Sequence, residues 1–105
     1  MPTNEELYDA ADRLKDEGKL DEAAAKLQEL LAQDAAYPLA HSALAVVLTR
    51  LGKHDEAIRH GLEVVRLEPN DPFSYTALSV TFQRAGKIPE AEDALARARM
   101  LQQGM

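Results

Sequence analysis

The sequence has no cysteine. Without thiols, a disulfide framework, a cysteine nucleophile and a zinc–thiolate site are all excluded. Aromatic residues are scarce, at 5% against 46% apolar residues, which favours helices packed through alanine and leucine over a strand-rich sandwich. No apolar run approaches the roughly 20 residues that cross a bilayer, and the acidic N-terminus lacks the pattern of a secretory signal. We therefore expect one all-α domain, residues 1–105, in the cytoplasm.

Basic residues are also in the minority, with 12 lysines and arginines against 18 acids and a net charge of −6. Nucleic-acid affinity depends on basic side chains that neutralise phosphates, so we expect no nucleic-acid partner. The imbalance lies at the N-terminal end, because residues 1–35 hold ten acids and four bases.

Catalytic and metal-binding motifs are missing as well. The chain has no nucleophile elbow and no phosphate loop. His41, His54 and His60 do not have the spacing of a two-histidine metal motif. His41 is expected to be a partly buried core residue, His54 to lie in a turn and His60 on an outer face. We predict that the protein is not an enzyme and that it has no cofactor and no metal site.

What the sequence does contain is a repeat. The stretch EGKLDEA at residues 17–23 returns as LGKHDEA at 51–57 and as AGKIPEA at 85–91. Gly18, Gly52 and Gly86 follow one another at intervals of 34 residues. A fixed period of this size is typical of stacked-repeat proteins, in which each unit is a pair of helices.

Helix signals recur with the same period. Thr3 and Glu6 form a capping-box pattern, and the apolar residues that follow recur at helical spacing over about 4–17, with a second helix over about 21–33. Each glycine is placed to end a first helix. We predict six helices in an α-α superhelix, or solenoid, of three repeats at approximately 4–37, 38–71 and 72–105. The expected starting residues are the caps Asp21, Asp55 and Asp71 and the first-turn prolines Pro38, Pro72 and Pro89.

Small residues at matched positions carry a resemblance to a known family. They are Ala11, Ala45 and Ser79 in the first helices and Ala23, Ala57 and Ala91 in the second helices. With the 34-residue period and the junction Leu67-Glu68-Pro69-Asn70-Asp71, this pattern resembles the tetratricopeptide repeat family. The first junction, at residues 33–37, departs from the family pattern because it lacks the proline.

The resemblance implies a function in protein binding. Arrays of this family use the first helix of each repeat to line a concave groove that holds a partner segment. The matched pairs Leu39/Phe73 and Val46/Val80 are apolar on that face, although Val46 and Val80 could instead pack between neighbouring first helices. Arg50 and Arg84 could hold a carboxylate or be ordinary solvated arginines. The predicted partner-binding residues are Tyr8, Asp12, Leu39, Ser42, Val46, Thr49, Arg50, Phe73, Thr76, Val80, Gln83 and Arg84.

One variant of the family clamps the acidic C-terminal tails of heat-shock chaperones with Lys, Asn and Arg side chains. The corresponding positions here hold Tyr8, Asp12, Val46, Phe73 and Ala77. The clamp is absent, so such tails are not the expected ligands.

The sequence therefore predicts a non-catalytic protein-interaction module whose partner is a protein or peptide. Two alternatives stay open. One is a self-assembling scaffold, either a head-to-tail chain or a homodimer closed through Leu95 and Leu101. The other is a small chaperone for secretion or complex assembly. The last repeat has Thr81, Glu92 and Arg99 where the second has Val47, Ile58 and Val65, and these polar residues are expected to cap the array.

Overall fold

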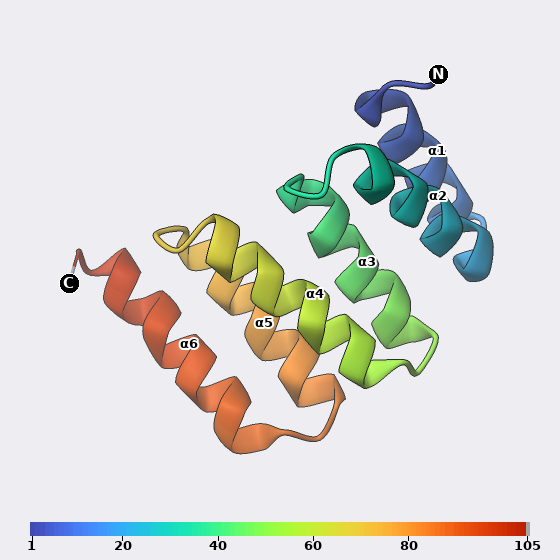
Figure 1. Ribbon diagram of the computed structural model, residues 1–105. Helices are drawn as coiled ribbons and strands as arrows, with labels where there is room; N and C mark the ends of the chain where they lie inside the picture. The colour runs from blue at the N-terminus through green and yellow to red at the C-terminus, as the bar shows by residue number, and fades with distance from the viewer. Residues whose placement is uncertain (105) are drawn as a thin grey trace.

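The computed structural model describes residues 1–104, and within them it contains helices and no strand. The helices form antiparallel pairs that stack side by side into a ladder running from the N-terminus to the C-terminus (Figure 1). The body is elongated, at 42 × 26 × 19 Å. The predicted all-α solenoid of three helix pairs is confirmed. The helices are α1 (Asn4–Asp16), α2 (Leu20–Gln33), α3 (Pro38–Arg50), α4 (His54–Leu67), α5 (Pro72–Arg84) and α6 (Ile88–Gln102).

The turn inside each pair is the same structure used three times. Gly18, Gly52 and Gly86 have φ values of +78°, +78° and +79°, a left-handed conformation that only glycine adopts without steric cost. The residue after the glycine then donates back to the helix, as Lys53 N–H does to the Leu48 carbonyl at 2.8 Å. This closure satisfies carbonyls at the helix end, which explains the predicted glycine stops.

Two of the predicted helix caps are present. The Thr3 hydroxyl accepts from the Glu6 N–H at 3.1 Å, and the Glu6 carboxylate accepts from the Thr3 N–H at 2.9 Å. Asp71 caps α5 by accepting from the Phe73 N–H at 3.0 Å. Pro38 and Pro72 are the first helical residues of α3 and α5, as predicted.

The predicted caps Asp21 and Asp55 are wrong, because the N-cap residues are Lys19 and Lys53, two positions earlier. Pro89 lies in the first turn of α6, as predicted, but it is the second helical residue and not the first. Helices α2, α4 and α6 begin at Leu20, His54 and Ile88, immediately after lysines that make no side-chain cap. The glycine turn is short, so the next helix starts before the chain reaches Asp21, Asp55 or Pro89. The two acids lie instead in the first turn, where they interact favourably with the helix dipole.

The best-filled part of the interior lies where the first two repeats meet. The largest fully buried side chains are Leu27 and Leu30 of α2 and Leu44, Val47 and Leu48 of α3. The small residues of the resemblance allow this close approach. Ala23 and Ala57 are 0% exposed, and helices approach to about 8–10 Å only where side chains at the crossing are small.

The interface between the second and third repeats is filled less well. Leu27 is 1% exposed, whereas the matched position in α4 is Gly61. A glycine inside a helix costs about 1 kcal/mol relative to alanine. A Cβ built at Gly61 would lie 3.0 Å from Cδ1 of Leu78, so Leu78 occupies part of the space that a side chain would take. The remaining space is part of a cavity that Gly61 and Leu78 line.

The expected polar cap at the C-terminal end is only partly present. Glu92 and Arg99 are exposed. Thr81 is buried, and its hydroxyl donates to the Ala77 carbonyl at 3.2 Å, so its predicted place on the outer end face is wrong. A threonine that bonds within its own helix can be buried at little cost. Leu95 and Leu101 are partly buried.

No helix within residues 1–104 has both the length and the apolar character needed to span a membrane.

Candidate functional site

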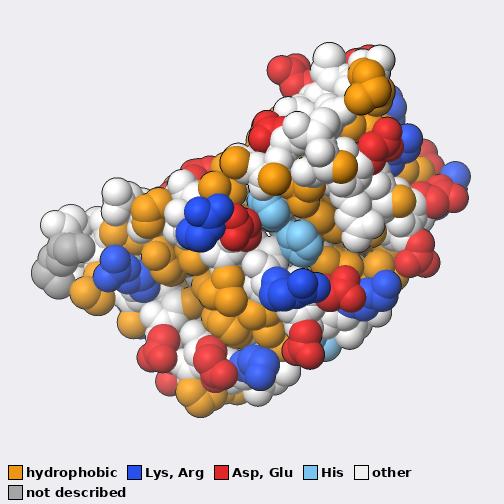
Figure 2. Space-filling view, in the orientation of Figure 1, with side chains coloured by type: hydrophobic (Ala, Val, Ile, Leu, Met, Phe, Trp, Pro, Cys, Tyr) orange, Lys and Arg blue, Asp and Glu red, His pale blue; other side chains and the backbone are white. Residues whose placement is uncertain are grey.

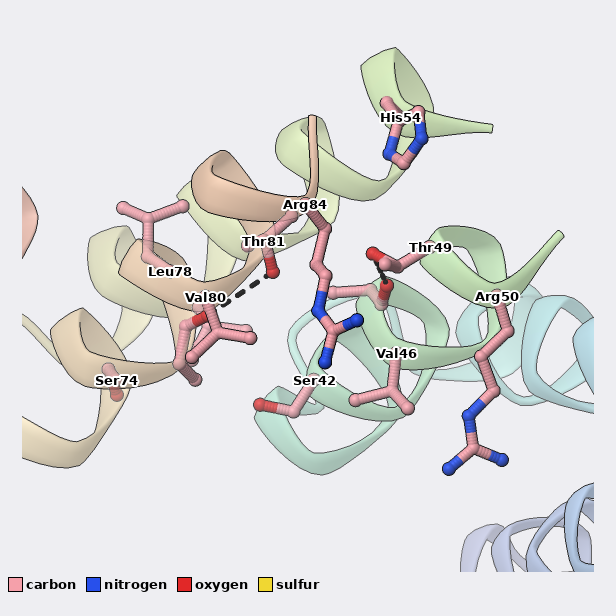
Figure 3. Close-up of a pocket in the computed structure, with 14 residues that line it drawn as sticks. Ser42, Val46, Thr49, Arg50, His54, Ser74, Leu78, Val80, Thr81 and Arg84 are labelled. Carbon is pink, nitrogen blue, oxygen red and sulfur yellow. Dashed lines mark hydrogen bonds between the residues drawn. The ribbon is translucent and has the colours of Figure 1, made fainter. Parts of the chain in front are cut away.

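A hollow with a volume of about 630 Å³ lies between α3, α4 and α5 (Figure 3). Most of the side chains around it are small, which is why it is not filled. Cavities of about 300–1,000 Å³ with mainly apolar walls are typical of binding sites. The lining residues are Ser42, Ala45, Val46, Thr49, Arg50, His54, Gly61, Val64, Ser74, Ala77, Leu78, Val80, Thr81 and Arg84.

Six of the twelve predicted binding residues line this cavity. They are Ser42, Val46, Thr49, Arg50, Val80 and Arg84. The other six do not line it: Leu39, Phe73, Thr76 and Gln83 lie on α3 and α5, and Tyr8 and Asp12 on α1. Asp12 forms an ion pair with Lys15 at 3.2 Å. The assignment of all twelve to partner binding stays a prediction.

The apolar pairs of α3 and α5 are open to solvent. Leu39 and Phe73 are 54% and 75% exposed, and Val46 and Val80 are 45% and 46% exposed. Val46 and Val80 therefore lie at the edge of the cavity and are not enclosed between the two helices. Exposed apolar side chains that gather on one face mark interaction surfaces more often than scattered ones do.

Sequence reasoning missed the floor of the cavity. Val64 and Leu78, each 5% exposed, form part of it, and their apolar character at helical spacing predicts core residues and not a binding surface. A signal was available, because a comparison of the matched positions Leu27 and Gly61 shows a large side chain replaced by none. The other lining residues that were not predicted are Ala45, His54, Gly61, Ser74, Ala77 and Thr81.

Two of the four hydroxyl groups around the cavity, those of Thr49 and Thr81, are satisfied within their own helices. Thr49 Oγ1 donates to the Ala45 carbonyl at 2.7 Å, and Thr81 Oγ1 donates to the Ala77 carbonyl at 3.2 Å (Figure 3). Such bonds to the carbonyl four residues earlier use the donor within the helix. These two threonines therefore present fewer free donors to the cavity than their residue type indicates.

Two arginines supply the charge at this site. In Figure 3 the guanidinium of Arg84 extends towards Ser42 and Val46, and Arg50 lies on the other side of Val46. The ion pairs found within residues 1–104 involve neither Arg50 nor Arg84. The mouth of an apolar cavity thus carries positive charge without an acidic partner from the described chain.

His41 and His60 make a pair away from this cavity. Their Nδ1 atoms are 2.9 Å apart, and His41 Nε2 lies 2.8 Å from the Ala35 carbonyl. A carbonyl only accepts, so in the state in which both rings are uncharged His41 donates from Nε2 and accepts at Nδ1 from His60 Nδ1–H. His41 is buried, as predicted, but His60 is partly buried and not on an open outer face. Figure 2 shows histidine side chains next to each other among acidic and basic ones.

This pair has a structural role and gives no sign of metal binding. Within residues 1–104 no group of three or more histidine, aspartate or glutamate side chains is arranged to hold a metal ion. The bonds of His41 tie the loop before α3 to helix α4.

The histidine pair predicts a pH dependence of folding. Burial lowers the pKa of His60 below its ordinary value of 6.5, and the positive charges of His41 and Arg59 lower it further, against the opposing effect of Glu56 and Glu63. The unfolded chain then binds more protons, so the stability present above about pH 6.5 should be lost as the pH falls through the folded pKa.

Urea unfolding measured at several values between about pH 7.5 and 5 tests this expectation. The denaturation midpoint should fall on acidification and should fall less in His60→Asn, which keeps a side-chain donor near His41. Gln28→Asn, a change at an exposed residue of α2 outside the pair, is the control and should keep the wild-type slope. An identical slope in His60→Asn and wild type would contradict the assignment.

Antiparallel helix pairs that recur every 34 residues and stack in one direction define an α-helical repeat solenoid. The family model of the tetratricopeptide repeat matches residues 8–72, more than half of the chain. The chain therefore belongs to the tetratricopeptide repeat family, as the period and the small residues indicated. No curated protein matches the sequence.

Solved structures share the fold. MamA superposes with a TM-score of 0.88 at 20% identity over 97% of this chain, which spans 60% of the MamA chain. The type III secretion translocator chaperone SycD of Yersinia enterocolitica gives 0.84 at 24% identity, covering 93% of this chain and 74% of SycD. The second TPR domain of Spaghetti (RPAP3), bound to the HSP90 peptide SRMEEVD, gives 0.84 at 19% identity, covering 94% and 92%.

Proposed function

We propose that this protein is a non-catalytic interaction module that holds a segment of a partner protein in the concave groove formed by α1, α3 and α5. The observation that carries the proposal is the exposed apolar track of α3 and α5, in which Phe73 is 75% and Leu39 54% exposed beside a cavity of about 630 Å³. Covering such a track removes apolar surface from water, at about 25 cal/mol for each Å².

The polar predicted residues come from the same three first helices as the proposed groove. Tyr8 and Asp12 come from α1, Thr49 from α3, and Gln83 and Arg84 from α5. Polar groups at the edge of an interface contribute more to specificity and orientation than to affinity. They would select the partner segment while the apolar pairs hold it.

The relatives support the same kind of function. The RPAP3 domain binds a peptide, and SycD is a chaperone for translocators. A small chaperone for secretion or complex assembly would use the same groove, so that alternative is one form of this proposal.

Affinity capture from the native host is the test of the proposed function. It should be run with the wild-type protein and with the double variant Phe73→Ala/Val46→Ala. Partners that depend on the groove should be retained by the first protein and lost by the second.

Self-association is a second candidate, favoured by apolar surface on the last helix. Ile88 is 47% exposed and Met100 41% exposed on α6, and the acidic first repeat could meet the C-terminal end of another copy. Light scattering over a range of concentrations should then show mass rising with concentration, and salt should reduce the rise if charge drives it. A constant monomer mass would exclude this candidate.

A further inference from the structure

The cavity exists because one repeat lacks the leucine that another has. Leu27 closes the interface between the first and second repeats, whereas Gly61 stands at the matched position in the next interface. Thr81 similarly replaces Val47, which is 0% exposed. The hollow is therefore built by specific residue types on α4 and α5, and it opens on the same face as the exposed apolar track.

We propose that this cavity is a socket for one apolar side chain of the partner segment, and that an acidic residue of the same segment lies over Arg50 and Arg84. This inference rests on the proposed function and adds the chemistry of the partner. A side chain that enters a desolvated pocket near the centre of an interface usually carries much of the binding energy.

The spacing of the segment follows from the helix geometry. On α3 the order is Leu39, Val46 and Arg50, and on α5 it is Phe73, Val80 and Arg84. A helix rises about 1.5 Å per residue. Leu39 and Phe73 therefore lie about 10 Å along the helices from the valines at the socket, and the arginines lie about 6 Å beyond those valines. An extended chain covers about 3.3 Å per residue.

The partner segment should consequently carry one apolar residue that contacts Leu39 and Phe73. A second apolar residue, about three positions away, would enter the socket, and an acidic residue about two positions beyond it would contact the arginines. This order holds for a segment that runs along α3 and α5, in either chain direction.

The exposed track favours a peptide over a small molecule. A small apolar acid could fill the cavity and reach Arg84, but it would leave Leu39 and Phe73 uncovered, because neither lines the cavity. A segment of about six residues covers all three places.

The charge at the socket favours an acidic segment. Arg50 and Arg84 make no ion pair within residues 1–104, and the nearby threonine hydroxyls are used within their own helices. A carboxylate would form charge-assisted hydrogen bonds with the guanidinium groups, whereas a basic segment would be repelled.

Selection from a phage-displayed library of random twelve-residue peptides tests the inference. Wild-type protein should enrich peptides with the predicted apolar, apolar and acidic spacing. The variant Arg50→Glu/Arg84→Glu should enrich a basic residue at the acidic position. Arg59→Glu, an exposed arginine on α4 outside the cavity, is its matched control and should enrich the wild-type pattern.

Occlusion of the socket is tested with Ala77→Leu. Ala77 lines the cavity and is exposed, so a larger side chain at this position can block the socket without entering the core. Gly61→Leu is unsuitable, because its side chain would collide with Leu78 in the core. The most enriched peptide, synthesised with a fluorophore, should bind Ala77→Leu at least tenfold more weakly by anisotropy. Ala96→Leu, an exposed alanine on α6, should bind as wild type does.

The outcomes separate this inference from the proposed function. Peptides that are lost in Phe73→Ala/Val46→Ala but bind Ala77→Leu normally would leave the groove standing and overturn the socket. Peptides that bind the double variant equally well would overturn both. Enrichment of nothing, together with a rise in melting temperature caused by decanoate, would mean that the cavity takes a small acid and that the peptide socket is wrong.

Discussion

Replacing both Phe73 and Val46 with alanine is expected to weaken binding of a captured partner by about 10- to 100-fold. This range corresponds to a loss of about 1.4–2.8 kcal/mol of binding free energy. Truncation of a central apolar contact often costs 2 kcal/mol or more in an interface. Phe73 is 75% and Val46 45% exposed in the free protein, so the substitutions remove little from the core. Calorimetry and pull-down measure the loss of binding.

The same double variant should keep its stability. Surface substitutions usually change the free energy of unfolding by no more than about 0.5 kcal/mol. Leu62→Ala provides a matched control. Leu62 is 46% exposed, close to the 45% of Val46, but it lies on α4 outside the cavity lining. Wild-type affinity in the double variant would contradict the proposed groove, and an equal loss in Leu62→Ala would show that apolar exposure alone is responsible.

Leu27→Ala is expected to lower the free energy of unfolding by about 2–5 kcal/mol, the usual cost of such a truncation in a core. Leu27 is 1% exposed and packs in one cluster with Leu30 and Leu44. A domain is stable by only about 5–15 kcal/mol, so this one change removes a large part of the total. Urea unfolding followed by circular dichroism measures it.

Leu95→Ala is the matched comparison for this prediction. Leu95 holds the same position in the third repeat, but it is only partly buried because no further repeat covers it within the described chain. Its truncation should cost clearly less than that of Leu27. Equal costs in the two variants would mean that the first interface is not the better-filled one.

Much of the fold was predictable because its signals are local. The left-handed turn at Gly52, the capping box of Thr3 and the side-chain cap of Asp71 depend on residues within a few positions of one another. The same local reasoning failed at Asp21 and Asp55. There the length of the glycine turn, and not the best capping side chain, decides where the next helix begins.

The candidate site was predictable only on its open side. Helical spacing identified Leu39, Val46, Phe73 and Val80 as residues off the core stripe, and all four are exposed. The floor formed by Val64 and Leu78 was not predicted. Periodicity assigns a residue to the inward face but does not measure whether the side chains that meet there fill the space.

The amino-acid sequence by itself determined that this protein is a stack of helix pairs, which faces point inward, and which apolar side chains remain outside. Those properties follow from a period of 34 residues and from the alternation of apolar and polar residues along each helix. Only the tertiary structure decided that the second interface is hollow, that Thr81 is buried, and that Arg84 extends towards the opening. Volume and direction depend on how side chains from different repeats meet, and a packed interior keeps a hole where a residue such as Gly61 is too small to fill it.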